Sequence, residues 1–156
     1  MIQVWGVFLV YRNIQIDREL DEKKIKSPLQ ALCIFAKDVN QVSLFYQQAL
    51  GLKVQASDKS HDLLVGQHHE VVVHAISKAY AQSIEIESPP QRREDVALKP
   101  IFVVEDLELV RAAAKTHGGY LKPIKQAWRI RGYIVLDGSD PEGNVIQFKQ
   151  LDPESQ

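Results

Sequence analysis

Short apolar runs and one longer amphipathic segment alternate in the first half of the chain. An apolar run at 32–36 precedes a helical pattern that begins after Asp38 and stops at Gly51. Aspartate is a favoured helix N-cap and glycine a favoured helix end, so a strand followed by a helix is predicted. Three more apolar runs predict three further strands, with a turn at 66–68 before the last: 52–54, 63–65 and 71–73.

The second half repeats this order at a fixed distance. Asp106 lies 68 residues after Asp38, and Gly119 lies 68 residues after Gly51. Self-similarity at a fixed period is typical of a duplicated unit. The predicted elements are a strand at 101–104, a helix at 107–117, and strands at 121–124, 132–136 and 144–148. The fold class that we predict is therefore α+β, with two tandem βαβββ modules.

The repeat also divides the chain into one domain with flanking segments. A bridge with two adjacent prolines separates the modules, since proline breaks helices and sheet ladders. The predicted parts are an N-terminal extension at 1–28, a domain at 29–150 and a tail at 151–156; within the domain, module one spans 29–77, the bridge 78–97 and module two 98–150.

An apolar run at 4–11 requires a separate interpretation. Its eight residues are too few for a membrane span, which needs roughly 20. No basic start precedes it, and charged residues follow at once, unlike a signal peptide. A first strand or a packing arm is the simplest prediction. A true start of the protein downstream of Met1 stays open.

Composition and charge exclude several classes of protein. The chain is 45% hydrophobic and 25% charged, which is typical of a globular domain. Nineteen basic residues against 20 acidic ones argue against a nucleic-acid-binding protein. A single cysteine, Cys33, excludes a disulfide framework and a thiolate zinc cluster. We expect a cytoplasmic protein with no nucleic-acid or membrane partner.

Two motifs resemble a known superfamily. The first is Phe45-Tyr46-x-x-x-Leu50-Gly51-Leu52, after a strand and Asp38, and the second is Asp140-Pro141-Glu142-Gly143-Asn144 near the end. Together they resemble the vicinal oxygen chelate superfamily of glyoxalase I, bleomycin-resistance proteins and extradiol dioxygenases, over about residues 29–150. The resemblance implies a curled mixed sheet around a cavity and a homodimer. Taken alone, Asp140–Asn144 predicts only a hairpin turn.

The resemblance also implies four metal-ligand positions on inward-facing strands. In this sequence they fall on Ala31, His74, Lys99 and Gln147. Alanine offers no ligand, lysine is a cation, and catalytic sites of this kind need about three protein ligands. We therefore expect no metal at these positions and no cofactor. A relocated metal site among His61, His68, His69 and His74 stays open, although His68 and His69 also fit a hairpin tip.

Five side chains could instead line a pocket for a small, flat or anionic molecule. Lys99 would place an ammonium where relatives hold a metal, and such a charge attracts carboxylate or phosphate oxygens. Gln147 and His74 offer hydrogen bonds, Trp128 an apolar wall and Arg131 a second cation. Each also has an ordinary structural interpretation, as a surface cation, a core histidine or a packing aromatic.

Three functions remain open. The first is a metal-independent binding protein with His74, Lys99, Trp128, Arg131 and Gln147 as ligand-binding residues. The second is a lyase, isomerase or dioxygenase that uses a relocated metal site, or Lys99 and His74 as acid and base. The third is a structural or regulatory partner whose arm at 4–11 docks on another chain. No catalytic residue is assigned.

Overall fold

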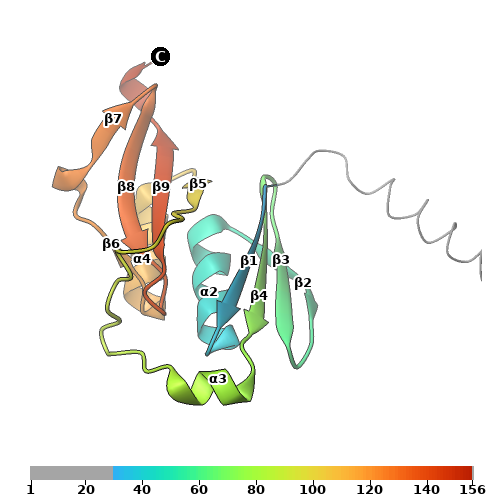
Figure 1. The fold of residues 1–156 in the computed structure, drawn as a ribbon. Helices are drawn as coiled ribbons and strands as arrows, with labels where there is room; N and C mark the ends of the chain where they lie inside the picture. Colours follow the sequence, from blue (N-terminus) through green and yellow to red (C-terminus); the bar gives the residue numbers. More distant parts are fainter. Residues whose placement is uncertain (1–29, 156) are drawn as a thin grey trace, which may run out of the picture.

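The computed structural model describes residues 30–155. Module one contains four strands and one long helix, and a short helix follows it in the bridge (Figure 1). The elements are β1 (Gln30–Ala36), α2 (Val39–Leu50), β2 (Lys53–Ser57), β3 (His61–Val65), β4 (His69–Ala75) and α3 (Lys78–Ser83). The predicted order of strand, helix and three strands is confirmed.

Module two repeats this order and adds one strand. Its elements are β5 (Ile101–Val103), α4 (Leu107–His117), β6 (Tyr120–Leu121), a 3₁₀ turn (Ile124–Gln126), β7 (Trp128–Ile130), β8 (Tyr133–Ser139), β9 (Val145–Leu151) and a final 3₁₀ turn (Pro153–Ser155). The strand predicted at 121–124 is wrong at its end, because Ile124 begins the 3₁₀ turn.

Two mixed sheets result, and they are not closed into a barrel. The first has the order β1-β4-β3-β2 and the second β5-β9-β8-β6, with β7 added beside β8. In each sheet the first strand of the module pairs in parallel with the last, and the other pairs are antiparallel. Figure 1 shows α2 between the two sheets. The predicted α+β class and βαβββ modules are confirmed.

Both long helices begin and end at the predicted residues. The Asp38 carboxylate accepts a hydrogen bond from the Gln41 backbone N–H at 3.0 Å, and Asp106 caps α4 in the same way. Gly51 ends α2 and Gly118 ends α4, each in the left-handed backbone region that glycine adopts readily. Equal caps at equal spacing give the modules their similar shape.

One apolar core joins the two modules. Its largest fully buried side chains include Phe45 and Tyr46 of α2, Phe102 of β5 and Phe148 of β9. The Tyr46 and Phe102 rings, which belong to different modules, lie 6.1 Å apart between centroids. The Phe45-Tyr46 part of the first motif is therefore core.

The turn at residues 140–144 is the predicted hairpin, between β8 and β9, and it also contacts module one. Asp140 is fully buried and accepts hydrogen bonds from the backbone N–H groups of Glu142 and Asn144, both at 3.0 Å. The Tyr46 hydroxyl donates to Asp140 Oδ2 at 3.3 Å. Burial and the neighbouring Asp140 charge raise the pKa of Tyr46 well above 10, so the phenol keeps its proton.

No helix within residues 30–155 is long and apolar enough to cross a membrane. The predictions for the N-terminal extension, including the run at 4–11, concern residues outside the described part of the chain.

Candidate functional site

The pairing of strands shows which positions correspond in the two modules. Asp38 and Asp106 cap the two helices 68 residues apart, and the same spacing relates Cys33 to Ile101. In the first sheet the residues aligned across β1, β4 and β3 are apolar: Cys33, Val72 and Leu63. At the matching places of the second sheet, on β5, β9 and β8, stand Ile101, Gln147 and Asp137. The same three places are thus apolar in one module and mostly polar in the other.

This register corrects one step of the sequence analysis. Matching β4 to β9 by apolar pattern alone puts His74 in the place of Gln147, whereas the paired strands put Val72 there. The match fails by two residues because side chains alternate along a strand, and a shift of two keeps every side chain on the same face. His74 instead lies between Phe35 on β1 and His61 on β3.

Lys99 and Gln147 come together around a carboxylate. Lys99 Nζ lies 2.9 Å from Asp137 Oδ1, and Gln147 Nε2 donates to the same oxygen at 3.2 Å. Lys122 Nζ lies 3.3 Å from Asp137 Oδ2. Two ammonium groups therefore share one carboxylate, and this cluster of three charged residues has a net charge of +1.

Asp137 remains ionised in this environment. Its burial raises the pKa, but hydrogen bonds from Lys99, Gln147 and Lys122 outweigh burial and hold the pKa below its ordinary value. The sequence analysis does not identify Asp137 or Lys122. A lone carboxylate in the otherwise apolar strand 133–138 is the signal that could have pointed to Asp137.

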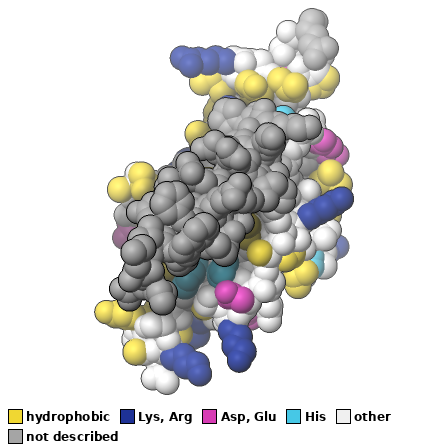
Figure 2. All heavy atoms as spheres, turned by 90° about the vertical axis from the view of Figure 1, so that its right-hand side faces the viewer, with side chains coloured by type: hydrophobic (Ala, Val, Ile, Leu, Met, Phe, Trp, Pro, Cys, Tyr) yellow, Lys and Arg dark blue, Asp and Glu magenta, His cyan; other side chains and the backbone are white. Residues whose placement is uncertain are grey.

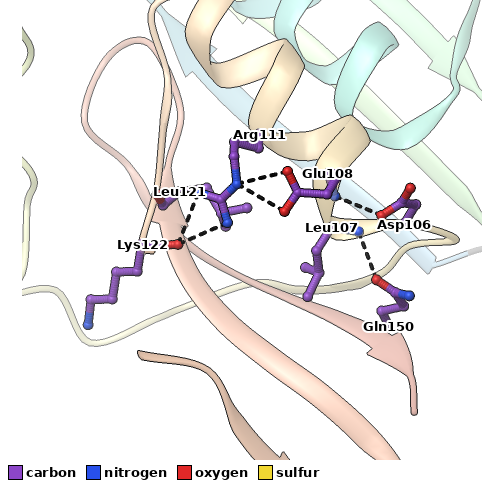
Figure 3. A network of polar contacts seen from close by, with 7 residues as sticks. All are labelled: Asp106, Leu107, Glu108, Arg111, Leu121, Lys122 and Gln150. Carbon is purple, nitrogen blue, oxygen red and sulfur yellow. Dashed lines mark hydrogen bonds and ion pairs between the residues drawn. The ribbon is translucent and has the colours of Figure 1, made fainter. Parts of the chain in front are cut away.

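Lys122 is positioned by helix α4. Arg111 Nη1 donates to the carbonyl oxygens of Leu121 and Lys122, both at 3.4 Å, while Arg111 Nε donates to Glu108 at 3.1 Å. Figure 3 shows the Lys122 side chain leading away from this network. The Lys122 backbone N–H also donates to the Asp137 carbonyl at 3.0 Å. The helix thus holds the backbone while the ammonium reaches the carboxylate.

The cluster lines a small polar pocket of about 240 Å³. Arg92 and Glu94 of the bridge complete its polar wall, and their side chains form an ion pair at 3.0 Å. Val145 of β9 supplies an apolar wall.

An apolar groove of about 330 Å³ adjoins this pocket, and Val145 lines both. The groove runs between β1 and the chain before β5. Its lining includes Leu32, Phe35, Leu98 and Pro100. Leu98 and Phe35 are largely exposed, at 83% and 62%. Polar and apolar recesses are thus neighbours on one part of the molecule.

The other predicted ligand-binding residues lie elsewhere. Trp128 is on β7, opposite Val135, and is 38% exposed. Arg131 is exposed in the tight turn between β7 and β8, and His74 is on β4 of the first sheet. None of the three lines the pocket that contains Lys99. No hydrogen bond within residues 30–155 joins Lys99 to His74 as an acid–base pair.

The four histidines of module one separate into different environments. His68 is exposed at the predicted hairpin tip, but His69 begins β4 and is buried. His69 Nε2 lies 3.1 Å from the Val103 carbonyl oxygen, and its Nδ1 has no partner. A carbonyl only accepts hydrogen bonds, so Nε2 carries the proton. His69 therefore links the modules and stays apart from His61 and His74.

The implied metal position does not fit a divalent ion. The residues there are Ala31, Val72 by the strand register, Lys99 and Gln147. The Lys99 ammonium already neutralises the one carboxylate nearby. Within residues 30–155, no group of three or more His, Cys, Asp or Glu side chains is arranged to hold a metal.

Comparison with known proteins gives a likeness in structure. No protein-family model and no curated protein matches the chain. A glyoxalase/bleomycin resistance protein/dioxygenase family enzyme from Burkholderia phytofirmans PsJN is 20% identical with a TM-score of 0.56, over 80% of this chain and 99% of that one. A glyoxalase/bleomycin resistance protein from Albidiferax ferrireducens T118 is 16% identical with a TM-score of 0.56, over 80% and 98%.

A third match is a fosfomycin resistance protein from Mesorhizobium loti. It is 7% identical with a TM-score of 0.53, over 84% of this chain and 97% of that one. Identities this low relate the three proteins to this chain by fold.

Proposed function

On the premise that this chain has the fold of the vicinal oxygen chelate superfamily, as the glyoxalase and bleomycin-resistance structures indicate, we propose that it binds a small organic anion without a metal. The anionic group lies in the Lys99–Lys122 pocket and a flat apolar body lies in the adjoining groove. The cluster of Lys99, Lys122 and Asp137, with its one excess positive charge, carries this proposal.

The two ammonium groups differ in how firmly they are held. Lys99 is closer to Asp137, at 2.9 Å, than Lys122 is, at 3.3 Å. Lys122 is therefore the cation that a ligand carboxylate engages, while Lys99 keeps Asp137 neutralised. Opposite charges attract more strongly at a partly buried site than in bulk water, which favours an anion over a neutral analogue.

The apolar groove supports an aromatic or similarly flat ligand. Organic ligand sites usually occupy about 300–1,000 Å³ with mostly apolar walls and a few polar groups. The polar pocket, at about 240 Å³, falls short of that range alone, and the groove of about 330 Å³ extends it. The shared residue Val145 makes them one continuous candidate site.

The test compares aromatic carboxylates with their matched neutral amides by isothermal titration calorimetry. We expect the acids to bind more tightly. Lys122→Met should weaken acid binding at least tenfold, roughly 1.4 kcal/mol, and leave amide binding unchanged. Lys78→Met removes an exposed lysine of α3 and is the matched control. Equal affinity for acid and amide, or no effect of Lys122→Met, would contradict the proposal.

A cytoplasmic homodimer is part of the same proposal. Cys33, the only cysteine, is a free exposed thiol, which suits a reducing compartment. The exposed apolar side chains of the groove give a second copy a surface to cover.

A further inference from the structure

Two histidines face each other across β3 and β4, away from the Lys99 pocket. His61 and His74 are direct partners in the antiparallel ladder, so their side chains project from the same face. Their ring centroids lie 6.0 Å apart and the ring planes differ by 9°. Figure 2, which views the side that carries the first sheet, shows histidine side chains at the surface beside an acidic one.

Hydrogen bonds define which nitrogen of each ring is available. His61 Nδ1 lies 3.1 Å from Asp58 Oδ1, and His74 Nδ1 lies 2.8 Å from the Ala75 carbonyl oxygen. Carboxylates and carbonyls only accept, so each Nδ1 carries a proton and each neutral ring keeps a lone pair on Nε2. No hydrogen bond to either Nε2 occurs within residues 30–155.

The surroundings favour a cation and restrict ring movement. Hydrogen bonds from Ser60 hold the pKa of Asp58 at about 2, so a negative charge stands behind His61 at neutral pH. Phe35 packs on the other side of His74, with ring centroids 5.5 Å apart. The His61 side chain is 35% exposed, which leaves the pair open to an ion from solvent.

We propose that His61 and His74 together bind one divalent transition-metal ion, such as Ni²⁺ or Zn²⁺, through their Nε2 atoms. Imidazole is a preferred ligand of these metals. Metal-bound histidines usually donate their other N–H to a carboxylate or carbonyl, which is the arrangement that Asp58 and Ala75 provide here.

The spacing of the rings suits a shared ion. With metal–nitrogen bonds of about 2.0–2.1 Å, two rings bound to one ion have centroids at most roughly 6.4 Å apart. The observed separation of 6.0 Å lies within this limit, so rotation of the rings is enough to point both lone pairs at one ion. Water or a bound molecule fills the remaining positions.

This site does not depend on the proposed anion binding. It uses neither Lys99 nor Gln147, and it lies on the first sheet rather than the second. With two protein ligands, it should bind metal more weakly than sites with three or four.

The experiment titrates Ni²⁺ into the full chain, free of any polyhistidine tag and stripped with a chelator. We expect one ion per chain with micromolar affinity. His61→Ala and His74→Ala should each weaken binding at least tenfold, and Asp58→Asn should weaken it about tenfold or more through the outer hydrogen bond. His68→Ala, at the exposed hairpin tip, is the matched control and should bind like the unaltered chain.

A second measurement avoids any dependence on variants that fold poorly. Zn²⁺ added to the unaltered chain should shift the ¹⁵N NMR signals of His61 Nε2 and His74 Nε2 and leave those of His68 and His117 in place. Ni²⁺ affinity should also be the same in Lys122→Met, which separates this site from the anion pocket. Binding retained in both alanine variants, shifts at other histidines, or no binding below about 1 mM would overturn the proposal.

Discussion

At the scale of single residues, one carboxylate decides the character of the second sheet. Asp137 draws Lys99, Lys122 and Gln147 together, whereas Leu63, at the matching place in module one, has apolar neighbours. A lysine at the implied metal position is therefore compensated locally. The excess charge of the cluster resides on the second lysine.

Replacement of Lys99 by methionine should raise the pKa of Asp137. Lys99 makes the strongest of the hydrogen bonds that lower this pKa, so its loss moves the value up toward the unfolded one. A lowered folded-state pKa stabilises the fold above the unfolded pKa, about 3.9, and this stabilisation is lost as pH falls through the folded pKa. Lys99→Met should therefore reduce the part of the stability that acid removes.

Carboxyl ¹³C NMR titration of Asp137 measures the shift directly, and urea unfolding at pH 7 and pH 3 measures the change in stability. Lys78→Met, at an exposed site, is the control. An unchanged Asp137 titration in Lys99→Met would show that the 2.9 Å contact does not persist in solution.

Gly143→Ala should destabilise the protein much more than Gly51→Ala. Both glycines have left-handed backbone angles, but a Cβ at Gly143 would overlap the Gln91 carbonyl oxygen, while none lies near Gly51. Gly51→Ala should cost about 1 kcal/mol from backbone strain alone, and Gly143→Ala about 3 kcal/mol or more. Urea unfolding of the two variants makes the comparison, and equal losses would contradict the close approach of the bridge.

Residue types alone predicted part of this chemistry. The meeting of Lys99 and Gln147 followed from the superfamily resemblance. Asp137 could not be assigned, because nothing local in the sequence says that β8 pairs with β9 so as to place Asp137 beside Gln147. The shift of His74 by two residues has the same origin, since alternation defines a face but not a register.

At the scale of elements, module two completes the start of the helix in module one. Glu142 Oε1 accepts the backbone N–H groups of Lys37 and Asp38, both at 2.7 Å. Glu142 itself is buried. The first turn of α2 therefore depends on a side chain more than 100 positions later in the chain.

Glu142→Ala should destabilise the protein by about 1–3 kcal/mol, because two buried N–H groups lose their acceptor. Glu142→Gln keeps a carbonyl oxygen in the same place and should cost clearly less. Thermal and urea unfolding of both variants tests the prediction. Equal losses in the two variants would mean that packing, rather than the hydrogen bonds, is what Glu142 contributes.

Elements with strong local signals were predicted well, and those without such signals were missed. The caps at Asp38 and Asp106 and the glycine ends fixed both long helices. Strand β7 escaped prediction because its turn is made by Arg131 and Gly132, and Arg131 has a positive φ of 49°, which its residue type does not announce. Helix α3 is only six residues long, below the length that periodicity reveals.

At the scale of the whole molecule, a shared core and an uncovered apolar surface act together. Tyr46, Phe102 and His69 tie the modules into one unit, while the groove side chains Phe35 and Leu98 stay exposed. An exposed apolar groove of this kind suits a ligand, a second chain or both.

Sedimentation velocity should therefore give a mass near twice the chain's 17.7 kDa. Leu98→Glu places a charge on the most exposed of the large apolar side chains and should shift the protein toward monomer. Tyr80→Glu, on exposed helix α3, is the control and should leave the mass unchanged. A monomer for the unaltered chain at micromolar concentration would refute the dimer.

The dependence of α2 on Glu142 has a consequence for synthesis on the ribosome. Proteins often begin to fold from their N-terminal part while translation continues. Here the first helix lacks the acceptor for two of its leading amides until residue 142 has left the exit tunnel, near the very end of translation. The nascent chain should therefore reach its native form late and all at once, and chains stalled before residue 142 should remain sensitive to protease.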